Sequence, residues 1–241
     1  LELSNLLHAI VERAAGLLDA TSGTLGLYDE ASREIKIAVN HNLGQFNIGT
    51  RLRLGEGAMG RVAETGEVLI IKDYHTWEGR ARQYHGKVLH ACLAAPLKVG
   101  TRLVGAMNIA TTDPDRHFDP ADVKLINLFA HQAAIAIENA HLFAEVQSRK
   151  RYSESLVQNS PVAIVSVDMD GNVSSWNPAA EGLFGFTQTE ALGCNLDTLI
   201  TATPEMLKEA KDFSRQTSEK ARIVHAITRR CCRDGKLLDV E

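Results

Sequence analysis

The feature that most constrains the fold is one long helical stretch, from Pro120 to about residue 157. Asp119 is a suitable N-cap, and proline is favoured at the first helical position. One apolar stripe recurs every three or four residues, as in a packing seam: Ile126, Phe129, Ala133, Ala136, Ala140 and Phe143. A second stripe, displaced by about 200° around the helix, consists of Leu128, Ile135 and Leu142. One stripe can cover a sheet, and the other needs a second partner.

For the second stripe we expect the same helix of a second copy, which predicts a homodimer formed through residues 120–157. The alternative is a helix that is buried on both sides within one domain.

The residues before this helix predict a largely antiparallel sheet. Residues 3–18 have helical apolar spacing, whereas 23–30 and 33–41 read as two strands joined by a short turn. Residues 65–73 supply a further strand. The stretches 89–100 and 102–112 flank Gly100 and Thr101 and predict a second hairpin.

Three glycines, Gly55, Gly57 and Gly60, have the G-x-G-x-x-G spacing of dinucleotide-binding turns. The helix expected after them covers only Arg61 to Thr65, because Gly66 ends it. A parallel crossover needs at least about 10–12 residues. We therefore interpret the motif as a glycine turn that leads into a short helix.

Composition limits the classes of function. The chain has 241 residues, enough for two domains, and its net charge of −4 gives no reason to expect nucleic acid or an anionic membrane as a partner. No apolar run approaches the roughly 20 residues of a membrane-spanning helix. The first residue is Leu, and we expect a segment of a longer, cytoplasmic protein. The four cysteines lack the spacing of a metal site, and of the adjacent Cys231 and Cys232 we expect one to be buried.

A second domain is expected after a boundary near residues 148–160, where the basic run 149–151 and the polar sequence QNSP interrupt the apolar pattern. Residues 162–177 read as a hairpin that turns at 170–172. Short helices follow, one of them with a Thr187/Glu190 capping box, and a second hairpin turns at Asp234 and Gly235. Trp176 and Phe184 are expected in the core.

Residues 1–147 resemble a GAF domain through the motifs LGEGAMGRVAETGE, AAPLKVGTRLVGAMNIA and FDPADVKLINLFAHQAAIAIENAHLF. Residues 158–241 resemble a PAS domain that lacks its last strand, through SPVAIVSVDMDGNVSSWNPAAEGLFGFTQTEALGCNLDTLI and RRCCRDGKLLDVE. Residues 148–157 are the helical linker. The resemblance implies an α+β protein of two domains, each an antiparallel sheet flanked by helices, joined by a long signalling helix.

The resemblance also implies a function: the sensory region of a bacterial signal-transduction protein, itself not an enzyme. A small ligand or partner would act on the GAF or PAS domain, and the dimeric helix would relay the signal to an absent output domain. Histidine kinases of two-component systems and cyclic-dinucleotide enzymes are common outputs of such proteins. The alternative is a structural dimerisation module with ligand-free pockets. A third possibility is an enzyme similar to the GAF-related sulfoxide reductases. These enzymes need a set of cysteines near the pocket, and only Cys92 lies in the first domain, which disfavours this possibility.

In GAF domains the pocket lies beside the loop that leads into the central strands, here residues 73–90. Aromatic and basic side chains in this loop could stack on a flat ligand and bind its carboxylate or phosphate, although a solvated loop is an equal alternative. Together with two strand residues, the candidate ligand-binding residues are Tyr74, His75, Trp77, Arg80, Tyr84, His90, Cys92 and Asn108. The cofactor is unknown, and no metal or catalytic residue is assigned.

Known ligand patterns of the two families match poorly. Asn108, Phe118 and Asp122 follow the cyclic-nucleotide pattern of GAF domains, but Ile109 replaces its Lys. We therefore expect the internal ion pair to Asp122 to be missing. The sequence His90-Ala91-Cys92 separates the adjacent Cys and His of bilin sites, and haem on His75, His85 or His90 is a minor alternative. In the second domain, Cys194 precedes rather than follows Asn195, which disfavours cysteinyl-flavin photochemistry.

Overall fold

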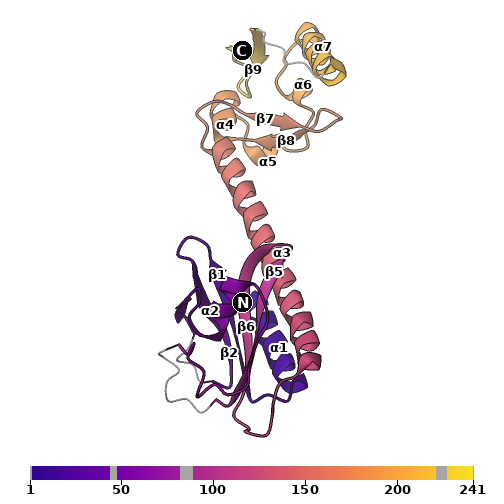
Figure 1. The fold of residues 1–241 in the computed structure, drawn as a ribbon. Helices are drawn as coiled ribbons and strands as arrows, with labels where there is room; N and C mark the ends of the chain where they lie inside the picture. The colour runs from indigo at the N-terminus through magenta and orange to yellow at the C-terminus, as the bar shows by residue number, and fades with distance from the viewer. Residues whose placement is uncertain (1, 44–47, 82–88, 221–226, 241) are drawn as a thin grey trace. The chain divides into compact units, whose positions relative to one another are not determined.

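The structure, a computed structural model, describes residues 2–43, 48–81, 89–220 and 227–240. The chain divides into two compact units, Leu1–Glu145 and Val146–Glu241 (Figure 1). The first unit contains α1 (Glu2–Leu17), β1 (Ser22–Asp29), β2 (Glu34–His41), β3 (Arg51–Arg53), α2 (Gly57–Thr65), β4 (Leu69–Ile71), β5 (Ala91–Val99), β6 (Arg102–Thr111) and the first part of α3 (Pro120–Gln158).

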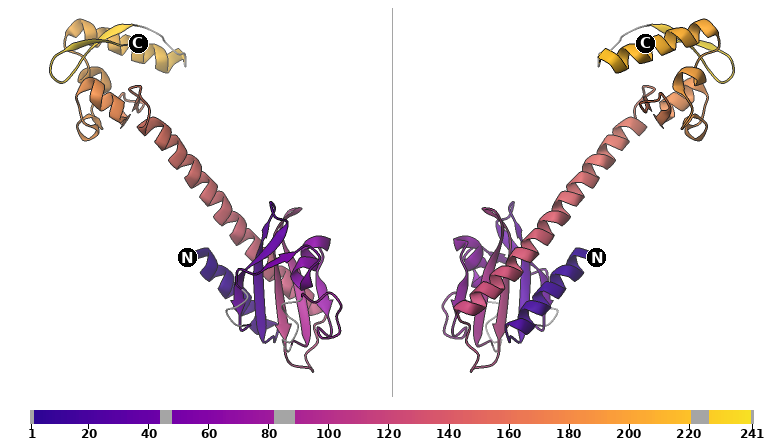
Figure 2. Two further views of the ribbon diagram at one scale, coloured as in Figure 1. Left: turned by 90° about the vertical axis from the view of Figure 1, so that its left-hand side faces the viewer. Right: turned by 90° about the vertical axis from the view of Figure 1, so that its right-hand side faces the viewer.

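The first unit is built on one six-stranded sheet in the order β3-β2-β1-β6-β5-β4, and its described pairings are antiparallel. The predicted hairpins are β1–β2 and β5–β6. Helices α1 and α3 cover one face of the sheet, and α2 covers the other (Figure 2). The sheet therefore has a core on each side: Leu25, Leu93 and Ile126 belong to the first, Ile37 and Val62 to the second.

The glycine motif has backbone roles that need no bound phosphate. Helix α2 begins at Gly57, so the predicted start at Arg61 was wrong, and Gly66 ends it in a left-handed conformation as expected. Gly55 adopts a φ of 83° in the preceding turn. A Cβ on Gly60 would lie 2.3 Å from the Arg53 carbonyl oxygen, so only glycine lets α2 approach β3 this closely.

Helix α3 is covered by the first unit only along its first half. Ile126, Phe129 and Ala133 are buried, but Phe143 at the end of the same predicted stripe is 66% exposed. The stripe therefore covers the sheet, as expected, over the first half of the helix, but its last residue, Phe143, takes no part in that contact. The side chain of Arg102, at the start of β6, forms an ion pair with Glu138 of α3, and the exposed part of the helix continues beyond this pair.

The second unit holds the end of α3, β7 (Val165–Val167), β8 (Val173–Trp176), α4 (Pro178–Phe184), α5 (Gln188–Ala191), α6 (Leu196–Leu199), α7 (Pro204–Lys220), β9 (Thr228–Cys231) and β10 (Leu237–Val240). Its strands form two separate antiparallel hairpins, β7–β8 and β9–β10. A small core contains Trp176 and Phe184, as predicted, and the Thr187/Glu190 capping box begins α5. Cys231 and Cys232 are both partly exposed, so the expectation that one is buried was wrong.

Among the described residues, no helix combines the length and the apolar character that crossing a bilayer requires.

Candidate functional site

A small internal space lies between α2 and the sheet of the first unit, where the sequence predicted a ligand pocket. Its volume is about 10 Å³, and Tyr74 and Asn108 line it together with Leu52, Met59 and Leu89. A cavity needs about 10–15 Å³ to hold one water molecule. The described side chains therefore fill this region of the first unit almost completely.

Two of the predicted ligand-binding residues, Cys92 and Asn108, bind each other. The Cys92 thiol donates a hydrogen bond to Asn108 Oδ1 at 2.6 Å across the paired strands β5 and β6. Burial raises the pKa of the Cys92 thiol well above its ordinary value, so the thiol stays protonated at neutral pH. Protonation makes it a poor nucleophile and a poor metal ligand.

Of the remaining predicted residues, Tyr74, Trp77 and His90 lie near one another, and the Tyr74 backbone N–H donates to the His90 carbonyl oxygen at 2.6 Å. Trp77 packs against buried Tyr74, with 5.8 Å between the ring centroids, whereas His75 is exposed and Arg80 is partly exposed. The His90 ring lies 5.8 Å from that of His117. Tyr84 and the minor candidate His85 lie outside the described residues. Within the described part of the chain, no group of three or more His, Cys, Asp or Glu side chains could hold a metal ion.

The pair between position 109 and Asp122 is absent, as Ile109 led us to expect, but Asp122 has an ion pair with another residue. The partner is Arg116, whose Nη2 lies 2.9 Å from Asp122 Oδ1. Arg116 comes from the segment before α3 and not from the strand position that Ile109 occupies. Spacing along the sequence could not indicate this pair, because the cation reaches Asp122 from a different element.

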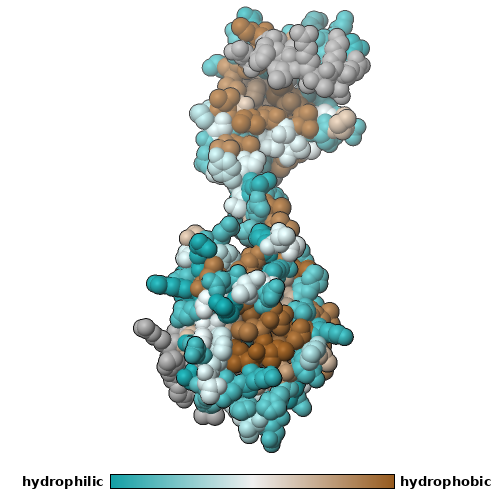
Figure 3. Space-filling model, in the orientation of Figure 1, coloured by the Kyte–Doolittle hydropathy of each residue, from teal (hydrophilic) through white to brown (hydrophobic). Residues whose placement is uncertain are grey.

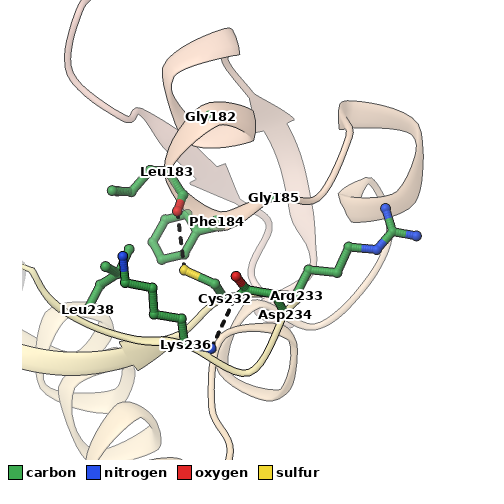
Figure 4. Close-up of a pocket in the computed structure, with 9 residues that line it drawn as sticks. All are labelled: Gly182, Leu183, Phe184, Gly185, Cys232, Arg233, Asp234, Lys236 and Leu238. Carbon is green, nitrogen blue, oxygen red and sulfur yellow. Dashed lines mark hydrogen bonds between the residues drawn. The ribbon is translucent and has the colours of Figure 1, made fainter.

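Much larger cavities lie in the second unit. One of about 540 Å³ is bounded by the end of α4 and the β9–β10 turn (Figure 4), which is within the range of about 300–1,000 Å³ for ligand pockets. Leu183, Phe184 and Leu238 give it an apolar wall, beside Cys232 and Lys236.

Two of the polar side chains that line this cavity already have partners. The Cys232 thiol donates to the Leu183 carbonyl oxygen at 3.2 Å, and burial raises the pKa of Cys232, which keeps the thiol neutral. Arg233 lies 2.7 Å from Glu190 of α5, and its guanidinium points away from the other residues drawn in Figure 4. Lys236 is thus the cation beside the apolar wall.

A second cavity, of about 650 Å³, lies between the β7–β8 turn and helices α6 and α7. The Asp168 carboxylate on its rim accepts the backbone N–H groups of Asp170 and Asn172, and these bonds, the Asn172 one foremost, lower the pKa of Asp168. Asp168 therefore stabilises the turn and has little capacity left for a ligand.

A family model described as GAF domain matches residues 1–138. The chain belongs to the GAF family. A model described as PAS fold matches residues 152–241, so a PAS domain follows the GAF domain.

Proteins of known sequence or structure are similar to parts of this chain. The anaerobic nitric oxide reductase transcription regulator NorR of Enterobacter sp. (strain 638) is 27% identical over 156 residues, which cover 63% of this chain and 29% of that regulator. The GAF domain of a phosphoenolpyruvate-protein phosphotransferase (ptsP) from Coxiella burnetii superimposes with a TM-score of 0.55 at 23% identity, over 59% of this chain and 86% of that chain.

One structural neighbour spans both domains. A chain in the crystal structure of the E. coli DhaR(N)–DhaL complex superimposes with a TM-score of 0.51 at 20% identity, over 99% of this chain and 79% of that chain. At these identities the structural likenesses show the fold alone.

Helix α3 presents the predicted second stripe to solvent. Leu128, Ile135 and Leu142 are 54%, 44% and 48% exposed, and they lie on the opposite side from the residues that the GAF domain buries. Further along the helix, Val146, Tyr152 and Leu156 are also exposed. Figure 3 shows hydrophobic residues beside hydrophilic ones along the visible side of α3 between the domains.

The sequence interpretation missed the polar residue that ties α3 to the PAS domain. Asn177 is fully buried, and its Nδ2 donates to the Val157 carbonyl at 3.1 Å and the Val162 carbonyl at 2.9 Å. Its Oδ1 accepts from the backbone N–H groups of Ile164 and Ala180. The Asn-Pro pair at the start of α4 signals an N-cap, but it gives no information about bonds to Val157.

Proposed function

We propose that this chain is the sensory region of a signal-transduction protein that acts as a homodimer paired along α3. The exposed stripe of α3 carries the proposal. Leu128, Ile135 and Leu142 repeat every seven residues, the period of a helix that pairs with a second helix. Pairing two copies would remove these side chains from water, at about 25 cal/mol per Å² of apolar surface.

The dimer can be tested by changing the stripe without touching the GAF core. We expect the double variant Ile135→Lys with Leu142→Lys to shift the mass by sedimentation velocity from dimer to monomer, with unchanged circular dichroism. Ala144→Lys is the matched control, because Ala144 is exposed and lies about 200° around the helix from Leu142. An unchanged mass in the double variant would contradict the proposed pairing.

We propose that the small ligand binds in the PAS domain. The GAF space of about 10 Å³ suits a closed dimerisation module, whereas the 540 Å³ cavity can admit a small organic molecule. The alternative function is a structural module, in which the pockets of both domains hold no ligand.

Native mass spectrometry and an absorbance spectrum of the purified protein decide between these functions. We expect a retained molecule that is lost in Leu183→Trp, which fills the cavity, but kept in Leu192→Trp. Leu192 has a similar exposure of 42% and does not line this cavity. An apo mass in every preparation would support the structural module.

For the output domain, the likeness to NorR supports control of transcription. The sequence alone suggested a histidine kinase or a cyclic-dinucleotide enzyme as the output. A cytoplasmic location remains part of the proposal. A reporter gene controlled by the full-length protein would test the output, since the stripe variant should then abolish regulation.

A further inference from the structure

Arg116, in the segment between β6 and α3, contacts two helices that are far apart in the sequence. Its Nε and Nη2 donate to the carbonyl oxygen of Leu18 at 3.1 and 2.7 Å, directly after the last residue of α1. Its Nη2 also donates to Asp122 Oδ1, at 2.9 Å, in the first turn of α3. The two hydrogens of Nη2 thus serve one helix each.

The charges at both contacts are favourable. The C-terminal end of a helix carries a partial negative charge, which a cation stabilises, and an acid stabilises the N-terminal end. Asp122 also accepts the backbone N–H of Asp119, while Asp119 Oδ1 accepts those of Ala121 and Asp122. Asp122 is therefore part of the cap that begins α3 as well as the partner of Arg116.

The Arg116 side chain is held in place by its surroundings. Its guanidinium carbon lies 4.8 Å from the centroid of the Phe118 ring, and Phe118 belongs to the core that α1 and α3 share. The side chain is only 23% exposed. A planar guanidinium can donate in several fixed directions at once, and the single ammonium of lysine does not reproduce that geometry.

We propose that Arg116 mechanically couples the end of α1 to the start of α3, so that a displacement of α1 is carried to the long helix. Without this side chain, α1 and α3 would still share an apolar core, but the carbonyl end of α1 would have no charged contact with the α3 cap. The coupling acts within one GAF domain, so it holds whether or not α3 pairs with a second copy.

Hydrogen–deuterium exchange of the full chain tests the coupling. Arg13→Gly loosens α1 at an exposed position, because glycine is a poor helix former. With Arg116 present, we expect this change to speed amide exchange at residues 121–126 of α3 about three- to fivefold. In the Arg116→Gln background, we expect Arg13→Gly to leave exchange at 121–126 unchanged.

Two further variants keep the test decisive. Asp122→Asn should speed exchange at 121–126 but leave residues 18–20 unaffected, since Arg116 still holds Leu18. Arg61→Gln breaks an exposed ion pair within α2 and should affect neither segment. If Arg116→Gln does not fold, Arg116→Lys replaces it, and the response to Arg13→Gly should again be lost. The proposal would be overturned if Arg13→Gly still sped exchange at 121–126 in the Arg116→Gln or Arg116→Lys background. A uniform increase in exchange across the whole sheet would also overturn it.

Discussion

The two ends of α3 are fixed by different chemistry. At the first end, charged groups predominate: Asp119 and Asp122 cap the helix, and Arg116 bonds Asp122. At the other end, the neutral amide of Asn177 binds the Val157 carbonyl. The side chains of Arg116 and Asp122 retain 23% and 16% exposure, whereas Asn177 is fully buried.

This difference determines which conditions can loosen each end. A partly exposed ion pair responds to pH and salt, because solvent screens it and a proton can neutralise the acid. A buried amide with four hydrogen bonds does not titrate, and losing it leaves several backbone groups unpaired. The GAF end of α3 is therefore the adjustable one, and the PAS end is the permanent one.

The largest effect should follow from Asn177→Ala. We expect it to lower the free energy of unfolding of the PAS domain by about 3 kcal/mol, because buried backbone groups lose their partners. The two tryptophans report separately, since Trp77 lies in the GAF domain and Trp176 in the PAS domain. Urea unfolding in a Trp77→Phe background would follow Trp176 alone.

Asn159→Ala is the control for this variant. Asn159 is exposed, and among the described residues its side-chain amide bonds Ser155 alone, one turn earlier. We therefore expect a change within about 0.5 kcal/mol. Equal losses from the two variants would mean that Asn177 does not anchor the end of α3.

A smaller effect is expected at the GAF end, where stability should depend on pH through Asp122. Burial acts to raise the pKa of Asp122, but hydrogen bonds from Arg116 and the Asp119 N–H outweigh it, and the pKa is lowered. The carboxylate therefore contributes stability above its unfolded pKa, near 4, and this contribution is lost as the pH falls through the folded value. We expect a contribution of about 1 kcal/mol.

The measurement is urea unfolding of the GAF domain, followed by Trp77 fluorescence in a Trp176→Phe background, between pH 7 and pH 3. Asp122→Asn should be less stable than the wild type at pH 7, and the difference should shrink towards pH 3. A difference that stays constant across this range would show that the charge of Asp122 has no role.

The sequence was sufficient for features that depend on local chemistry or on periodicity. The stripe at Leu128, Ile135 and Leu142 follows from helical spacing, and these side chains are exposed in the structure. Their pairing with a second copy stays a prediction. The Thr187/Glu190 capping box and the end of α2 at Gly66 depend on neighbouring residues, and both are present.

Features that depend on residues far apart in the sequence could not be predicted in this way. Arg116 contacts the Leu18 carbonyl, which lies 98 positions away, and no pattern marks that partner. The near-complete filling of the GAF space depends on how Met59, Tyr74 and Leu89 pack together, so the aromatic loop residues alone suggested more room than the described side chains leave. The cavity beside α4 needs two elements that are about fifty residues apart.

The smallest effect should come from Arg102→Gln, which breaks the ion pair with Glu138 where the covered half of α3 ends. Arg102 is 52% exposed, and exposed pairs contribute about 0–1 kcal/mol. We expect the free energy of unfolding of the GAF domain, measured in urea, to change by no more than about 0.5 kcal/mol. Lys98→Gln serves as a comparison, because the Lys98 ammonium caps α2 through the Gly66 carbonyl. A loss above about 1.5 kcal/mol from Arg102→Gln would exceed what an exposed pair supplies. The contact at Glu138 would then be a firm anchor of α3 to the sheet, and the adjustable part of the helix would be limited to the turns before Glu138.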